Sequence, residues 1–209
     1  MEPPIGIQLA GAGKRHGRTW ILRGIDLDVP PGQSLAILGA NGSGKSSLLR
    51  LMCGFDRASE GEVTWRTEEQ SMDAMEVPML GAYCAPDQDL IPDLTVQEHI
   101  ALHHNLRPCA DGIDVKGTLR LALLDQKGDV RVRHLSSGMR QRLALTLAFT
   151  TDSRALFLDE PTSHLDRSGV DWYAQLMVDW RRGRTTIVAS NHDPQDYPGA
   201  QSTWEVPVS

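Results

Sequence analysis

The residues best suited to chemistry form a glycine-rich loop in the first quarter of the chain. Residues 39–46 read Gly-Ala-Asn-Gly-Ser-Gly-Lys-Ser, the full G-x-x-x-x-G-K-[ST] pattern. Such a backbone can wrap a polyphosphate with inward-pointing N–H groups. The pattern predicts that Lys45 reaches the β and γ phosphates of a nucleoside triphosphate and that Ser46 binds Mg²⁺. The predicted nucleotide-binding residues are Gly39, Ala40, Asn41, Gly42, Ser43, Gly44, Lys45, Ser46 and Ser47.

A strand and a helix are expected on either side of this loop. Residues 34–38 are an apolar run typical of a buried strand, and residues 47–53 have the pattern of a helix whose N-terminus faces the phosphates. The alternative is a chance glycine-rich turn. A full match in a chain of this size is expected in roughly one unrelated protein in a hundred or fewer.

A second candidate group is the acidic pair Asp159 and Glu160, which ends the apolar run 155–158. Sheets of α/β proteins carry their chemistry at the carboxyl ends of strands. We expect Asp159 to hold Mg²⁺ through water, beside Ser46, and Glu160 to polarise an attacking water. In isolation these residues would indicate only a strand and an acidic turn, but the upstream phosphate loop favours the catalytic interpretation.

A third group lies at the start of a predicted helix. Residues 135–139 read Leu-Ser-Ser-Gly-Met and are followed by Arg-Gln-Arg-Leu. Ser136, Ser137 and Gly138 would offer a phosphate backbone donors, a hydroxyl and the positive end of a helix dipole. Alone, the segment could be merely a capped helix. If this segment does bind phosphate, the chain has two phosphate sites, here and at the loop 39–46, and the presence of two needs an explanation.

Together the three groups resemble the ATPases of ATP-binding cassette (ABC) transporters, whose signature loop usually reads Leu-Ser-Gly-Gly-Gln. Ser137 and Met139 depart from that form. The resemblance covers nearly the whole chain and implies an α/β P-loop NTPase core of the ABC type. An N-terminal antiparallel β subdomain and an inserted α-helical subdomain would complete the fold. It also implies a head-to-tail dimer, in which the signature of one subunit covers the γ phosphate held by the loop of the other.

The resemblance assigns roles to three further positions. His192 follows a predicted strand and falls at the family's switch histidine, which acts with the catalytic Glu160. Residues 163–166 look like the loop that reaches across the dimer. His16 maps to the aromatic residue that stacks on adenine, with Trp20 as the nearby alternative, and an imidazole offers less stacking surface than a tyrosine.

Gln88 corresponds to the family's loop glutamine, which touches Mg²⁺ and senses the membrane subunit. The surrounding sequence matches, but the spacing is one residue short, so Asp87 or water could take the task instead. An ordinary polar loop residue is the other interpretation of Gln88. With Gln88 included, the expected Mg²⁺ ligands are Ser46, Asp159 and Gln88.

Length and pattern predict one domain with a sizeable insertion. Residues 1–85 are expected to form the first part of the nucleotide-binding core, residues 86–150 the helical subdomain with the signature, and residues 151–209 the second part of the core. Within the insertion, Thr95 and Glu98 resemble a capping box that begins a helix ending near Leu106. Further helices are expected at 116–124, 137–150 and 166–182.

The composition of the chain indicates which partners it has and where in the cell it is found. A formal charge of −6 and a pI near 5.6 argue against a surface that coats nucleic acid, and no apolar run approaches the thickness of a bilayer. Three cysteines without C-x-x-C spacing suit a reducing cytoplasm. We expect a cytoplasmic protein, peripheral on the inner face of the cell membrane through an integral membrane permease subunit, that dimerises with a second ATPase subunit to form a homodimer.

The resemblance implies a subunit that binds and hydrolyses ATP, closes as a dimer and drives the membrane partner. The brevity of the chain and residues 136–191 are similar to small exporter-type cassettes, including those proposed for haem export in cytochrome c maturation. The alternative is a soluble ABC-type ATPase that drives the assembly or remodelling of a protein complex. A GTPase would need a guanine-reading Asn-Lys-x-Asp segment, which the sequence lacks.

Overall fold

The computed structural model describes residues 2–86 and 90–207. The chain forms two compact units. The sheet unit comprises Met1–Tyr83, Ser153–Glu160 and Arg182–Ser209, and the helical unit comprises Cys84–Asp152 and Pro161–Arg181. The segment expected to be the second part of the core, 151–209, is thus divided between the two units.

An antiparallel sheet in the order β2-β1-β4 begins the sheet unit. Its strands are β1 (Gly6–His16), β2 (Thr19–Val29) and β4 (Glu60–Arg66). Strands β1 and β2 are longer than the sequence indicated, because the register shifts between Leu9 and Ala12 and again near Lys14. Such bulges interrupt the alternation of apolar and polar residues from which a strand is predicted.

A five-stranded sheet in the order β5-β6-β7-β3-β8 forms the rest of the sheet framework. The strands are β3 (Ser34–Leu38), β5 (Gly81–Cys84), β6 (Ala155–Asp159), β7 (Thr185–Ser190) and β8 (Ser202–Glu205). Strands β6, β7, β3 and β8 pair in parallel. Every residue of β6 and β7 is buried, as expected for parallel strands covered on both faces.

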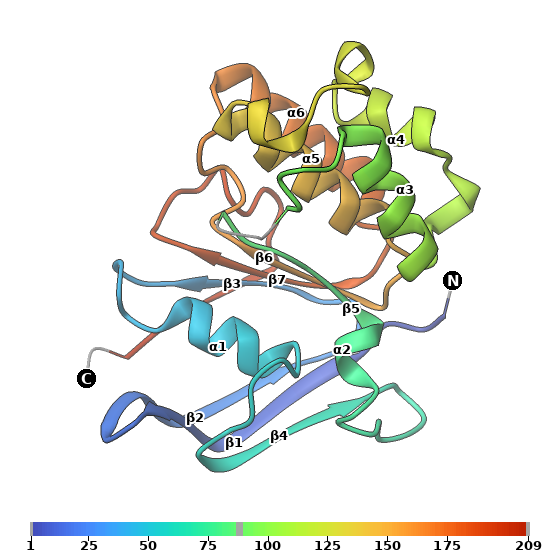
Figure 1. Ribbon diagram of the computed structural model, residues 1–209. Coiled ribbons are helices and arrows are strands. Elements are labelled where there is room, and N and C mark those ends of the chain that lie inside the picture. Colours follow the sequence, from blue (N-terminus) through green and yellow to red (C-terminus); the bar gives the residue numbers. More distant parts are fainter. Residues whose placement is uncertain (1, 87–89, 208–209) are drawn as a thin grey trace. The chain divides into compact units, whose positions relative to one another are not determined.

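Helix α1 (Lys45–Met52) lies between the two sheets of this unit (Figure 1). Leu48, Leu49 and Met52 on this helix are completely buried in a core shared with both sheets. The indole N–H of Trp65 on β4 donates a hydrogen bond of 2.8 Å to the carbonyl of Met52. The antiparallel sheet therefore holds the far end of the helix whose start borders the phosphate loop. A short helix, α2 (Val77–Leu80), leads into β5.

The helical unit contains α3 (Val96–Leu106), α4 (Val115–Leu121), α5 (Ser137–Thr150) and α6 (Arg167–Trp180). Single 3₁₀ turns at Ala110–Gly112, Asp125–Lys127 and Val132–His134 connect them. The predicted capping box is confirmed: the Glu98 N–H donates to the Thr95 hydroxyl, and the Thr95 N–H donates to the Glu98 carboxylate. Val96, Ile100, Leu143 and Leu147 pack in a separate core.

The expected fold class is confirmed: an antiparallel β subdomain accompanies a parallel-sheet nucleotide core, and the inserted residues are helical. Among residues 2–86 and 90–207, none of the helices has both the length and the apolar composition needed to cross a membrane.

His103 on α3 is a half-buried histidine that links two segments of the helical unit. Its Nε2 lies 2.8 Å from the hydroxyl of Thr151, which itself donates to the Leu147 carbonyl. The imidazole N–H is therefore the donor in this contact. Burial, with smaller contributions from Arg107, His104 and His99, lowers the pKa of His103 from 6.5 to about 4.

This shift predicts acid sensitivity. An unfolded His103 takes up a proton below pH 6.5 while the folded one stays neutral, so its contribution to stability is complete above pH 6.5 and is lost as the pH falls towards 4. We expect this protonation to cost about 3 kcal/mol of unfolding free energy across that interval. Urea unfolding at several pH values should show a shallower loss for His103→Gln, which keeps an N–H donor. His134→Gln, at an exposed position, should retain the wild-type pH dependence; equal slopes for all three proteins would contradict the assignment.

Candidate nucleotide site

The phosphate loop connects the end of β3 to the start of α1, as the sequence predicted. Gly44 directly precedes the helix in a left-handed conformation with φ of 98°. A Cβ at this position would lie 2.9 Å from Leu22 Cδ2, so side chains of β2 press closely on the loop. At the other end, a Cβ on Gly39 would lie 2.7 Å from the Ser43 hydroxyl. Glycine is thus required at both ends for backbone or steric reasons, before any ligand is considered.

Lys45 is almost completely buried, with 4% of its side chain exposed. Its ammonium group donates to the carbonyl oxygens of Gly39, at 2.8 Å, and Ala40, at 3.1 Å. It also lies 3.9 Å from Glu160 Oε1. A buried ammonium is costly unless it is hydrogen-bonded. The loop carbonyls therefore stabilise a buried cation beside Glu160.

Asp159 ends β6 and is only 5% exposed. Its carboxylate oxygen Oδ1 is buried without a hydrogen-bond partner among the described residues. Burial raises the pKa of the Asp159 carboxyl, as do the neighbouring Glu160 and Asp196, while Ser46 and Lys45 oppose the shift. An unpaired carboxylate oxygen beside a hydroxyl is a hard oxygen donor set, which fits Mg²⁺.

Glu160 follows directly, with a left-handed backbone at φ of 41°. Its N–H donates to the Ala189 carbonyl at 2.9 Å, which fixes the backbone to the end of β7. A non-glycine residue in this region carries strain that its surroundings must hold in place. The turn leaves 36% of the carboxylate side chain exposed, beside the buried Lys45.

His192 lies two residues beyond β7, also with a positive φ of 59°. Before it, the Ser190 hydroxyl donates to the buried carboxylate of Asp196 at 2.6 Å and accepts from the Asp193 N–H at 3.1 Å. His192 Nε2 lies 3.6 Å from Glu205 Oε1 at the end of β8. Neither Asp196 nor Glu205 was among the site residues predicted from the sequence. Ser190 followed by Asp193 could have indicated the local turn in which Asp196 takes part. The position of Glu205, in contrast, depends on the pairing of strands that are distant in sequence.

The expected base-binding residues lie at the β1–β2 hairpin. His16 is exposed at the end of β1. The guanidinium groups of Arg23 and Arg15 approach the Trp20 ring centroid at 4.9 and 5.8 Å. The indole is thus engaged by cations, whereas the His16 imidazole is open to solvent. Gln88 and Asp87 lie outside the described residues.

The signature residues begin α5 in the helical unit. Ser136 caps the helix by accepting a hydrogen bond of 3.2 Å from the Met139 N–H. A Cβ on Gly138 would lie 2.9 Å from the carbonyl oxygen of His164, so the helix start and the 163–166 loop are in close contact. A cavity of about 320 Å³ opens there, lined by Ser136, Ser137, Gly138, Met139, Arg142, His164, Leu165 and Asp166.

Asp166 belongs to the same arrangement. Its carboxylate accepts from the Gly169 N–H at 2.8 Å, and so caps α6, and it lies 3.4 Å from Arg142 of α5. The signature and the predicted dimer-crossing loop, distant in sequence, therefore lie side by side. The phosphate loop, Asp159 and Glu160 are likewise brought together in the sheet unit.

Comparison with sequence families gives a match to the family described as ABC transporter over residues 22–163. Mouse ATP-binding cassette sub-family A member 7 is 32% identical over 203 residues, which cover 91% of this chain and 9% of that protein. The sulfate/thiosulfate import ATP-binding protein CysA of Bacillus cereus is 34% identical over 169 residues, or 78% of this chain and 47% of that protein. The chain thus spans about half or less of these two relatives.

A relative of more similar length is the aliphatic sulfonates import ATP-binding protein SsuB 3 of Nocardia farcinica, 33% identical over 91% of this chain and 72% of its own length. Among solved structures, the dimeric post-hydrolysis state of the ATP-binding cassette MJ0796 bound to ADP and Pi has a TM-score of 0.79 at 22% identity, covering 96% of this chain and 94% of that one.

An ATP-bound bacterial Atm1-family ABC exporter has a TM-score of 0.81 at 22% identity, over 99% of this chain and 37% of that one. At these identities the two structures show a shared fold. The family match and the sequence relatives carry the assignment further: the chain belongs to the ABC transporter family of ATP-binding cassette ATPases.

Proposed function

We propose that this chain binds and hydrolyses ATP as the nucleotide-binding subunit of an ABC transporter and drives a separate integral membrane permease subunit. The observation that carries the proposal is the buried Lys45 ammonium, held across a glycine loop beside the carboxylates of Asp159 and Glu160. Family membership supports the same activity. Lys45 would exchange its carbonyl partners for the β and γ phosphates, and the N–H groups of residues 39–47 would surround them.

The adenine base would stack on His16, with Trp20 as the alternative platform. Ser46 and Asp159, with Gln88, would hold Mg²⁺, and the ion would neutralise charge on the phosphates when bound. The unpaired Oδ1 of Asp159 supports this set of ligands.

Hydrolysis would depend on Glu160 and His192. The Glu160 carboxylate orients a water and accepts its proton as the water oxygen bonds to the γ phosphorus. The bond from that phosphorus to the β–γ bridging oxygen breaks, and ADP leaves with the electron pair. His192 positions the γ phosphate, and Glu205, 3.6 Å away, supports the imidazole. Catalysis is then mainly positioning and electrostatic stabilisation.

The second phosphate site would act in a head-to-tail homodimer. Ser136, Ser137 and Gly138 of one subunit would cover the γ phosphate held by the loop of the other, so that ATP closes the dimer and hydrolysis reopens it. The cavity at the start of α5 supports this role. The MJ0796 cassette, whose fold is similar, is itself dimeric.

The proposed direction of transport is export, at the inner face of the cell membrane. It rests on the similarity of residues 136–191 to small exporter-type cassettes, including haem exporters. CysA and SsuB are named as import proteins, so direction needs its own measurement. Transport in inverted membrane vesicles, in which an exporter accumulates its substrate, would provide it.

Glu160→Gln tests the catalytic assignment. The amide keeps the size of the side chain but cannot accept a proton, so turnover should fall at least about 100-fold while ATP binding is retained. Phosphate release and equilibrium binding of labelled ATP measure the two quantities. Glu62→Gln, an exposed acid on β4, is the matched control and should hydrolyse ATP normally. Unchanged hydrolysis by Glu160→Gln would overturn the assignment.

Asp159→Asn tests the metal assignment through stability. Because burial raises the pKa of Asp159, the native state favours the protonated acid, and this favourable contribution is lost as the pH rises through the folded-state pKa. Removing the charge should raise the unfolding free energy at pH 8 without nucleotide, and should abolish the added stabilisation by Mg²⁺ with ATP. Asp171→Asn, exposed on α6, should change neither quantity. Retention of the Mg²⁺ effect in Asp159→Asn would count against the proposed ligands.

The membrane partner is tested by co-purification. A tagged chain, extracted with detergent from cell membranes in the presence of ATP, should carry an integral membrane protein in stoichiometric amount. Recovery of only soluble partners would instead support an ATPase that drives assembly or remodelling of a protein complex.

A further inference from the structure

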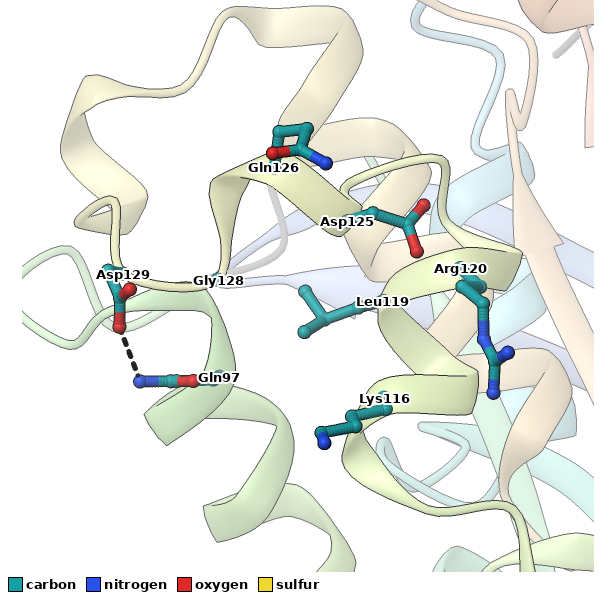
Figure 2. A pocket seen from close by; sticks show the side chains of 8 residues that line it. All are labelled: Gln97, Lys116, Leu119, Arg120, Asp125, Gln126, Gly128 and Asp129. Atoms are coloured by element: carbon teal, nitrogen blue, oxygen red, sulfur yellow. Dashed lines mark hydrogen bonds between the residues drawn. The ribbon is translucent and has the colours of Figure 1, made fainter.

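A second cavity, of about 520 Å³, lies in the helical unit (Figure 2). The residues that line it come from the start of α3, one face of α4 and the turn that follows: Gln97, Lys116, Leu119, Arg120, Asp125, Gln126, Gly128 and Asp129. Its volume lies in the range of small-molecule sites, roughly 300–1,000 Å³. None of these residues belongs to the proposed ATPase machinery.

Opposite charges line this cavity without neutralising one another. Lys116 and Arg120 lie one turn apart on α4, Asp125 begins the 3₁₀ turn after it, and Asp129 lies two residues beyond that turn. The ion pairs among the described residues, defined by nitrogen and oxygen atoms within 4.0 Å, include none of these four. Asp129 instead accepts a hydrogen bond of 2.7 Å from the neutral amide of Gln97.

An apolar surface separates the charges. Figure 2 shows Lys116 and Leu119 extending from α4 towards Gln97 on α3, with Asp129 beside Gln97 on the opposite side. Leu119 is 8% exposed and so forms a largely buried floor. A Cβ on Gly128 would lie 3.5 Å from both Leu119 Cδ1 and Gln97 Oε1, which puts this glycine at the same floor.

We propose that the cavity binds small zwitterions whose carboxylate and ammonium lie at opposite ends of an apolar chain, as in ω-amino acids. The ligand carboxylate contacts Lys116 and Arg120, its ammonium contacts Asp129, and its apolar chain lies over Leu119. A simple anion would be repelled by Asp125 and Asp129, and a simple cation by the two basic residues. Only a ligand that carries both charges gains from both sides of the cavity. This site is independent of the nucleotide site.

The probe is 6-aminohexanoate, in which five methylene groups separate a carboxylate from an ammonium. Hexanoate and hexylamine are the matched controls, since each has a similar chain and one charge. Titrations of the ¹⁵N-labelled chain should show saturable shifts at the amides of Gln97, Gly128 and Asp129. The dissociation constant for the zwitterion should be at least about tenfold lower than for either control.

Variants assign the contacts. Lys116→Met and Asp129→Asn should each weaken binding of 6-aminohexanoate about fivefold. Gly128→Leu should block it by filling the cavity; the backbone there is right-handed (φ −50°, ψ −45°), so a side chain adds no strain. Lys127→Met changes a neighbouring residue that does not line the cavity and should bind normally. The affinity for ATP should be unchanged in all four variants, and measuring it checks that each variant is folded.

Three results would overturn the proposal. Equal binding of hexanoate and the zwitterion would show a plain anion site, and the absence of saturable shifts up to about 10 mM would show that no such site exists. Wild-type affinity in both Lys116→Met and Asp129→Asn would equally reject it.

Discussion

The parallel register of β3, β6 and β7 is the constraint on which the nucleotide site depends. Leu38 pairs with Ser190, and Asp159 pairs with Ala189, so three strands end at the same level. The phosphate loop, the acidic pair and the histidine segment continue from those ends. Every residue of β6 and β7 is buried, so close packing of side chains on both faces holds this register. The chemistry is thereby positioned by residues that take no part in it.

Burial also sets the electrostatic character of this edge. Lys45 and Asp159 are both almost inaccessible, yet the ammonium has two carbonyl partners while one carboxylate oxygen has none among the described residues. Glu160 adds a strained backbone beside them. These features cost stability in the isolated chain. A polyphosphate with its cation would satisfy them, which gives ligand binding a physical reason to stabilise the folded state.

Local patterns made much of this arrangement predictable. The phosphate loop, the Thr95 capping box and the start of α5 follow from a few adjacent residues, and their positions agree with the structure. The full lengths of β1 and β2 were not predictable, because bulges break their alternation. Glu205 was missed because its place beside His192 comes from the pairing of β8 with β3, which no local pattern encodes. Sequence thus indicated the proposed catalytic and binding groups better than the residues that support them.

The close approach of Gly138 to the His164 carbonyl has a mechanical consequence. With so little space between them, the start of α5 cannot slide past the 163–166 backbone, and the Arg142–Asp166 contact joins the same two segments a turn further along. A displacement of either segment would therefore move the other with it. The helical unit would therefore present these two segments to a neighbouring subunit as one rigid surface, and they would not move independently of each other.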